Sequence, residues 1–291
     1  MQDRSGEFER HRPRLFGIAY RMLGSRTDAE DILQDAYLRW HRGASDEIRS
    51  PEAWLVTAVT RLCIDRLRTA RVEREQYIGP WLPEPLIGDA APAADTRAEL
   101  SSSLSIAFLV VLEQLTPDER AAFLLHEVFD TDYAEIAEIL GKSEAACRQI
   151  VSRARRRVRG QRPRAQVSDA ARRSVLERFA NAIQAQDKSA LLELVAEKAS
   201  WTSDGGGRTR AALKVIRGRE RIARFAVAVL GRLVDQVVFE MTTANGEPAL
   251  AIRVDGRIFS IITVRTDGLR VLDVYTVLNP DKLATAAGTP G

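Results

Sequence analysis

Nine basic side chains lie between Lys142 and Arg164, and Glu144 is the only acid among them. Cationic groups at this density neutralise phosphates, so the segment favours a nucleic-acid backbone as its partner. Arg and Gln side chains in the same segment can also form bidentate hydrogen bonds with base edges. The alternative for this segment alone is the solvated tail of an ordinary helix.

A helix that starts after Gly141 sorts these residues onto two opposite faces. The apolar face holds Cys147, Ile150, Val151, Ala154 and Val158. The polar face holds Arg148, Gln149, Ser152, Arg153, Arg155, Arg156 and Arg159. The preceding TDYAEIAEILG segment reads as a second helix that ends in a glycine turn. Two helices joined in this way predict a helix–turn–helix with a recognition helix.

Three further helices are expected near the N-terminus. Residues 8–42 read as two helices separated at Gly24-Ser25, and Ser50-Pro51 has the residue types of a helix start. The second helix carries an acidic ridge on a different face from its apolar stripe, formed by Asp28, Asp31 and Asp35. The third carries basic side chains, which suit phosphate contacts: Arg61, Arg66, Arg68, Arg71 and Arg74.

Residues 76–99 break the helical pattern with four prolines and two glycines, which indicates a linker. Apolar residues in this linker, among them Tyr77, Ile78 and Trp81, are too many for a freely solvated segment. We therefore expect the linker to pack on another part of the chain.

The last part of the chain differs in kind. Helices are expected over 168–185 and 211–231, followed by alternating strands within 234–243, 248–255, 257–266 and 269–278. Asn-Gly and Asp-Gly pairs punctuate the strands at hairpin spacing. Helices followed by an antiparallel meander predict an α+β domain, a curved sheet wrapped on helices as a cone-shaped half-barrel.

Composition excludes several classes of protein. The formal net charge is +3, and 45% of residues are hydrophobic, as in ordinary globular proteins. No run of apolar residues is long enough for a membrane span, and the charged N-terminus does not read as a secretory signal. Two cysteines and three histidines predict neither a disulfide framework nor a metal site. We expect a cytoplasmic protein without membrane contact.

Together these segments resemble the sigma factors of bacterial RNA polymerase, in the extracytoplasmic-function (ECF) class. DAEDILQDAYLRWHR and WLVTAVTRLCIDRLR are similar to parts of sigma region 2, and residues 104–160 are similar to region 4. The resemblance implies a multi-domain chain: region 2 over 1–75, a Pro-rich apolar linker over 76–103, region 4 over 104–164 and a further domain over 165–291.

The resemblance also implies a function, which is binding of core RNA polymerase (clamp and flap) and recognition of promoter DNA. Asp31, Gln34 and Asp35 would contact the polymerase, and the five arginines of the third helix would contact the −10 element. In region 4, Arg148, Gln149, Ser152 and Arg153 would reach −35 bases. The backbone contacts there would come from Arg155, Arg156 and Arg157.

One subclass of these factors carries a C-terminal domain similar to SnoaL-like (NTF2-like) proteins, together with three short motifs. The linker motif reads here Trp81-Leu82-Pro83-Glu84-Pro85-Leu86. The second reads Asp204-Gly205-Gly206-Gly207-Arg208, with Arg where the family has Lys. The third reads Asn279-Pro280-Asp281-Lys282-Leu283. The resemblance implies that this domain acts in cis, and replaces or supplements a separate anti-sigma protein. We expect the apolar linker to pack on this domain, in an interface that sets the relative placement of the two DNA-binding modules.

Three other functions compete with this interpretation. The C-terminal domain could be a SnoaL-like enzyme with Trp201, Asp204, Asp273 and Tyr275 around a cavity, or a sensor that binds a small molecule there. A DNA-binding regulator that acts without polymerase is a third reading, but it leaves the region 2-like half unexplained. We therefore expect no catalytic residues, no metal and no cofactor, and leave a small-molecule ligand open.

Overall fold

The computed structural model describes residues 4–42, 48, 50–88, 104–159, 167–230 and 237–284. They form two compact units. The helical unit contains the first 75 residues together with residues from 108 onward up to Arg159. The C-terminal unit contains residues 76–88, 104–107 and 167–284. Linker residues 76–88 therefore belong to the C-terminal unit, whereas the two helical modules share one unit.

The first helical module consists of α1 (Arg4–Leu23), α2 (Arg26–Arg42) and α3 (Pro51–Glu75). Gly24, in the left-handed region at φ 67°, ends α1 as the sequence predicts. Ser50 begins α3, because its hydroxyl accepts a hydrogen bond from the Ala53 amide at 3.3 Å. The predicted apolar stripe of α2 is buried, including Ala29, Leu33 and Trp40.

The second helical module consists of α5 (Ile106–Leu112), α6 (Pro117–Glu127), α7 (Tyr133–Leu140) and α8 (Glu144–Arg159). Thr116 and Glu119 form a capping box at the start of α6. Asp132 caps the start of α7, and Gly141 ends it in the left-handed conformation at φ 63°. These caps fix the short α7–α8 turn of a helix–turn–helix.

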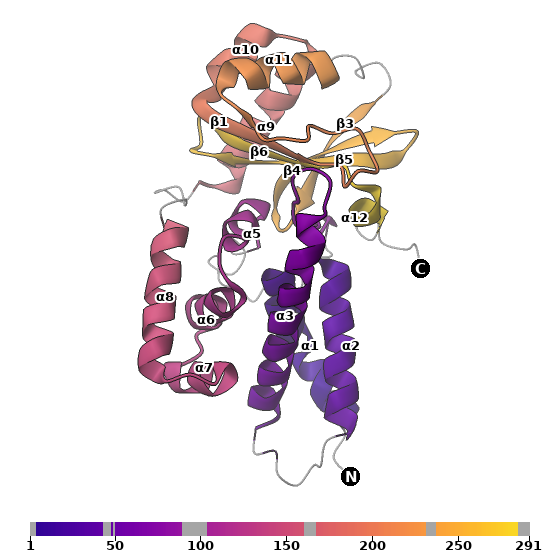
Figure 1. Cartoon of the computed structure of the whole chain (residues 1–291). Coiled ribbons are helices and arrows are strands. Elements are labelled where there is room, and N and C mark those ends of the chain that lie inside the picture. Colours follow the sequence, from indigo (N-terminus) through magenta and orange to yellow (C-terminus); the bar gives the residue numbers. More distant parts are fainter. Residues whose placement is uncertain are drawn as a thin grey trace. The chain divides into compact units, whose positions relative to one another are not determined.

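The C-terminal unit is a six-stranded sheet with three helices over one face (Figure 1). Its helices over the sheet are α9 (Asp169–Gln184), α10 (Lys188–Leu194) and α11 (Arg219–Leu230), and a short α12 (Pro280–Ala284) ends the described chain. Its strands are β1 (Val195–Asp204), β2 (Ile216–Arg217), β3 (Val238–Ala244), β4 (Glu247–Val254), β5 (Arg257–Thr266) and β6 (Val271–Val277). The strand order is β2-β1-β6-β5-β4-β3.

The core of this unit lies between the sheet and the three helices. Trp201 of β1 is 1% exposed, and its ring packs against Phe179 of α9 and Phe225 of α11. Strand alternation sends Trp201 to the helix-covered face and Asp204 to the opposite face. The linker and α12 both bind Asp204 on that opposite face.

The sheet corrects two sequence predictions. It is not only an antiparallel meander, because β1 pairs parallel to β6. Sequence alternation missed β1, since Ala196, Glu197 and Lys198 have low strand propensity and a bulge interrupts its pairing. The helix expected over 211–231 is shorter, because β2 pairs with β1 and Gly218 turns the chain at φ 90°.

Candidate nucleic-acid interface and linker-docking site

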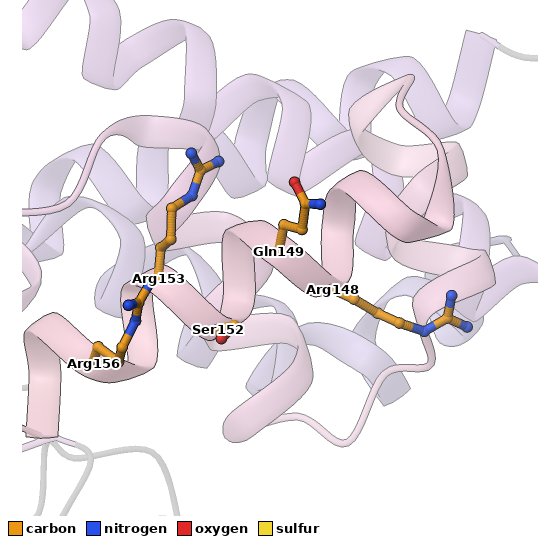
Figure 2. Close-up of a pocket in the computed structure, with 5 residues that line it drawn as sticks. All are labelled: Arg148, Gln149, Ser152, Arg153 and Arg156. Atoms are coloured by element: carbon orange, nitrogen blue, oxygen red, sulfur yellow. The ribbon is translucent and has the colours of Figure 1, made fainter.

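The polar face of α8 is the candidate nucleic-acid interface. All five residues predicted for the apolar face of this helix are buried, which turns the polar face to solvent. Five polar residues line a shallow depression of about 370 Å³ along α8 (Figure 2): Arg148, Gln149, Ser152, Arg153 and Arg156. This set includes all four residues predicted to reach bases. Arg162 and Arg164 lie outside the described residues.

Several α8 arginines already have acidic partners. Arg148 pairs with Glu144 at 2.6 Å, and its guanidinium lies 5.1 Å from the centre of the Tyr133 ring. Arg155 pairs with Glu127, and Arg157 pairs with Glu119 at 2.7 Å. The Arg148–Glu144 pair is about half exposed and costs little to exchange for a phosphate or a base. The α8 face is therefore organised before any ligand binds.

The predicted −10 arginines all lie on α3, but they differ in accessibility. Arg68 and Arg71 are exposed and form surface ion pairs with Asp65 and Glu75. Arg66 is partly buried between Asp28 and Glu73, both of which it binds. Solvated pairs such as those of Arg68 and Arg71 release their arginines readily.

Arg61 connects the two helical modules. Its guanidinium donates to the backbone oxygens of Glu138, at 2.8 Å, and Ile139, at 3.0 Å. Both oxygens belong to the last turn of α7, where carbonyls lack a partner within the helix and the helix dipole favours a cation. The predicted DNA contact of Arg61 thus competes with a contact inside the protein.

Arg74 is bound inside the helical unit. It pairs with Glu113 and donates to the Leu23 oxygen at 3.1 Å. Glu113 also accepts from Arg120 at 2.8 Å, and the Arg120 side chain is only 3% exposed. Burial lowers the pKa of Arg74, and the Glu113 charge offsets part of this effect. A DNA contact by Arg74 would require this network to open.

The acidic ridge of α2 is open to solvent. Asp31, Gln34 and Asp35 are exposed, and neither aspartate has an ion pair among the described residues. Asp28, at the start of the ridge, instead binds Arg66 at 3.1 Å. The exposed ridge of Asp31, Gln34 and Asp35 suits a partner with a basic surface. Complementary charges across such an interface steer association and fix its register.

The linker-docking site is built around the carboxylate of Asp204, which is fully buried. Asp204 Oδ2 accepts from the Leu82 amide at 2.8 Å and from Lys282 Nζ at 2.7 Å. Asp204 Oδ1 accepts from the Tyr77 hydroxyl at 2.5 Å. One carboxylate therefore joins the linker, the end of β1 and α12, three segments far apart in sequence.

Lys282 contacts the linker as well as Asp204. Its ammonium also donates to the Leu82 oxygen at 2.5 Å and lies 4.2 Å from the centre of the Trp81 ring. A buried cation with a carboxylate, a carbonyl and an aromatic face around it is well compensated for the loss of water. Burial, with a further contribution from the hydrogen bond to Asp204, raises the pKa of Tyr77. The Tyr77 hydroxyl therefore stays a donor even at an alkaline pH where a free tyrosine would ionise.

The second motif requires glycines because side chains of other segments lie directly against its backbone. Gly206 has φ 57°, and a Cβ there would lie 2.3 Å from Asn279 Nδ2. A Cβ on Gly207 would lie 2.8 Å from the Ile78 side chain. The linker and the third motif therefore fit against bare backbone, which only glycine provides here.

The remaining motif residues complete the site. Asn279 donates to the Tyr77 hydroxyl at 2.9 Å and accepts from the Asp281 amide at 3.0 Å. Arg208 pairs with Asp281 at 3.3 Å on the surface. The site thus brings together all three motifs, which span Trp81–Leu86, Asp204–Arg208 and Asn279–Leu283.

Sequence reasoning missed two residues that hold the linker. Tyr77 was predicted only as part of an apolar cluster, although its hydroxyl binds Asp204. Asn245 lies in the β3–β4 turn and holds Leu86 by two hydrogen bonds. Its side-chain oxygen accepts from the Leu86 backbone amide at 3.1 Å, and its backbone amide donates to the Leu86 carbonyl oxygen at 2.8 Å. An Asn-Gly pair signals a hairpin turn, but nothing in that signal shows that the turn also binds a distant segment.

Of the four residues of the predicted enzyme site, Asp204, Asp273 and Tyr275 share one face of the sheet and Trp201 lies on the other. Trp201 packs into the core on the helix-covered face, whereas Asp204 is committed to the linker on the opposite face. Asp273 is bound by Ser200 and Arg265. Among the described residues, no group of three or more His, Cys, Asp or Glu side chains is placed to hold a metal. Within the same part of the chain, no helix is long and apolar enough to cross a membrane.

Comparison with known proteins matches both helical modules to established families. The family described as Sigma-70 region 2 matches residues 8–72, and the one described as Sigma-70, region 4 matches residues 105–158. The ECF RNA polymerase sigma factor SigJ of Mycobacterium tuberculosis is 39% identical over 95% of this chain and 92% of its own length.

Two further comparisons cover almost the whole chain. The probable ECF RNA polymerase sigma factor SigI of the same species is 29% identical over 96% of this chain and 94% of its own length. The crystal structure of SigJ has 37% identity and a TM-score of 0.76, and the match covers 97% of this chain and 99% of that one. The similarity therefore includes the linker and the C-terminal unit.

Proposed function

Since this chain belongs to the ECF family of RNA polymerase sigma factors, we propose that docking of its linker on its own C-terminal unit holds it in a closed, less active state. As a sigma factor it is a transcription-initiation protein that works with RNA polymerase and promoter DNA, and it is not an enzyme. Its activity is controlled within one chain by this docking. The protein acts in the cytoplasm and needs no cofactor.

The observation that carries the proposal is the buried Asp204 carboxylate and its bonds to Leu82 and Lys282. These bonds fix linker residues 76–88 on the C-terminal unit, which also contains residues 104–107. Docking therefore shortens the free chain between the two helical modules. A shorter tether raises the effective concentration of one module at the other and favours their contact.

Contact between the modules occupies groups that DNA binding needs. Arg61 caps α7 and Arg74 binds Glu113, so a phosphate would have to compete with these contacts for either guanidinium in this state. Release of the linker lengthens the tether and lets the modules separate to the spacing of two promoter elements. The two states differ in linker docking, and a partner that binds the open state shifts the equilibrium towards it.

We assign the binding surfaces as follows. The exposed ridge of Asp31, Gln34 and Asp35 binds the polymerase clamp, and the second helical module binds the flap. The α3 arginines contact the −10 element, and the α8 face reads the −35 element. Control by the C-terminal unit makes a separate anti-sigma protein unnecessary for the closed state.

Run-off transcription with core polymerase tests the function directly. The intact chain is expected to start transcripts from selected promoters, whereas core polymerase alone is not. A chain with Asp31 and Asp35 both changed to Ala is expected to lose most of this activity, because the exposed acidic ridge no longer holds the polymerase. Activity equal to that of the unchanged chain would exclude the ridge as the polymerase contact.

Base reading by α8 is tested by comparing two kinds of substitution. Arg148→Ala and Gln149→Ala are expected to lower discrimination between −35 sequences by about 1–3 kcal/mol each, because alanine cannot form a bidentate contact with a base. Arg156→Ala, the matched control on the same helix, is expected to weaken binding to all sequences equally. Binding to a panel of mutated −35 elements measures both effects. An unchanged ranking in the Arg148 and Gln149 variants would contradict the assignment.

A further inference from the structure

A second concentration of basic side chains lies in the C-terminal unit, outside the sigma modules. Residues 210–224 contain six basic residues and one acid, Glu220. The basic run comprises Arg210, Lys214, Arg217, Arg219, Arg221 and Arg224, and all six are exposed. The linker-docking site uses none of them.

The fold places the basic run along one edge of the C-terminal unit. The chain leaves the end of β1, returns beside the same strand as β2 at the edge of the sheet, and continues into α11. Ile222, Ala223 and Ala226 bury the inner face of α11. Arg221 and Arg224, one turn apart, therefore share its outer face.

The six cations of this run have no acidic partner among the described residues, in contrast to other cations of the same unit. Arg172, Arg208 and Arg265 each pair with a carboxylate. The one acid of the run, Glu220, is bound by Lys188 at 3.6 Å. A row of like charges without counter-charges repels itself and attracts a polyanion.

We propose that the basic run contacts the phosphate backbone of promoter DNA, so that the C-terminal unit is a third DNA-binding surface. This inference rests on the proposed function, in which the chain itself holds promoter DNA. Five of the six residues are arginines, whose planar guanidinium groups bind phosphate oxygens bidentately. Because the sigma modules tether the unit beside the DNA, weak phosphate contacts gain from a high effective concentration.

The test uses the full chain in complex with core polymerase. One variant changes Arg210, Lys214, Arg221 and Arg224 to Gln. The matched control changes four other exposed arginines of the same unit to Gln, which removes the same charge: Arg173, Arg178, Arg257 and Arg270. The measurement is the dissociation constant for a labelled promoter duplex over a series of KCl concentrations.

The slope of log Kd against log salt is expected to fall by about 0.9 for each phosphate that the variant no longer binds, or about 2–4 in total. The control should keep the slope of the unchanged chain. The ranking of mutated promoters should stay the same, since phosphate contacts carry no sequence information. Equal slopes in the variant and the control would overturn the proposal.

Two other outcomes have distinct meanings. If the variant assembles poorly with core polymerase but keeps its salt slope on DNA, an acidic protein surface is the partner and the DNA proposal is wrong. If the unchanged chain with core polymerase shows no selective promoter binding, the proposed function fails before the basic run is tested. The salt slope, the assembly with core polymerase and the promoter binding of the unchanged chain therefore distinguish a failure of the DNA-contact proposal from a failure of the proposed function.

Discussion

Asp204→Ala is expected to lower the stability of the docked linker by about 3–5 kcal/mol, because it removes the carboxylate of a buried ion pair and leaves the ammonium in place. That ammonium belongs to Lys282, whose side chain is only 12% exposed. The Tyr77 hydroxyl and the Leu82 amide lose an acceptor in the same step. Native-state hydrogen exchange at the Leu82 amide measures the effect as reduced protection.

Asp281→Ala is the matched control for this experiment. Asp281 belongs to the same cluster and also forms an ion pair, with Arg208, but both side chains are about two-thirds exposed. Exposed pairs contribute ~0–1 kcal/mol, so protection of the Leu82 amide should change little. Similar losses in the two variants would show that burial of the Asp204 carboxylate is not what holds the linker.

Glu113→Ala is expected to destabilise the helical unit by about 3–5 kcal/mol. Glu113 is the shared carboxylate of Arg74 and Arg120, and its removal deprives the buried Arg120 guanidinium of that negative charge. Because Arg120 also donates to the Met22 oxygen at 2.6 Å, the network joins the two helical modules. Urea unfolding followed by helical circular dichroism measures the loss of stability.

The control for this change is Glu144→Ala, which removes an exposed pair with Arg148 one helical turn away. Such pairs contribute ~0.3–0.5 kcal/mol. A Glu113 variant as stable as the Glu144 variant would mean that the modules are held by their apolar contacts alone.

Helix capping and periodicity, which involve only residues close in sequence, were sufficient to predict most of the helical unit. Thr116 and Glu119 form the capping box that their spacing predicts, and Gly141 adopts the positive φ expected at the end of α7. The apolar and polar faces of α8 also follow from periodicity. These features depend on residues within one or two turns, and a sequence shows such neighbours directly.

Contacts between distant segments could not be predicted in this way. The sequence suggested that the linker packs on the C-terminal unit, but not that Asp204 accepts from Leu82 across 122 positions. Strand β1 was hidden by residues of low strand propensity, and its parallel partner β6 lies far along the chain. Arg61 was predicted for DNA alone, because its contact with the end of α7 requires the packing of two modules.

The central claim is that the docked linker restrains initiation. The most direct measurement is run-off transcription with core polymerase and a recognised promoter, comparing the unchanged chain with Asp204→Ala and Asp281→Ala. The claim predicts several-fold more transcript from Asp204→Ala at equal protein concentration, and an unchanged amount from Asp281→Ala. An Asp204 variant that folds, yet produces the same amount of transcript or less, would contradict it.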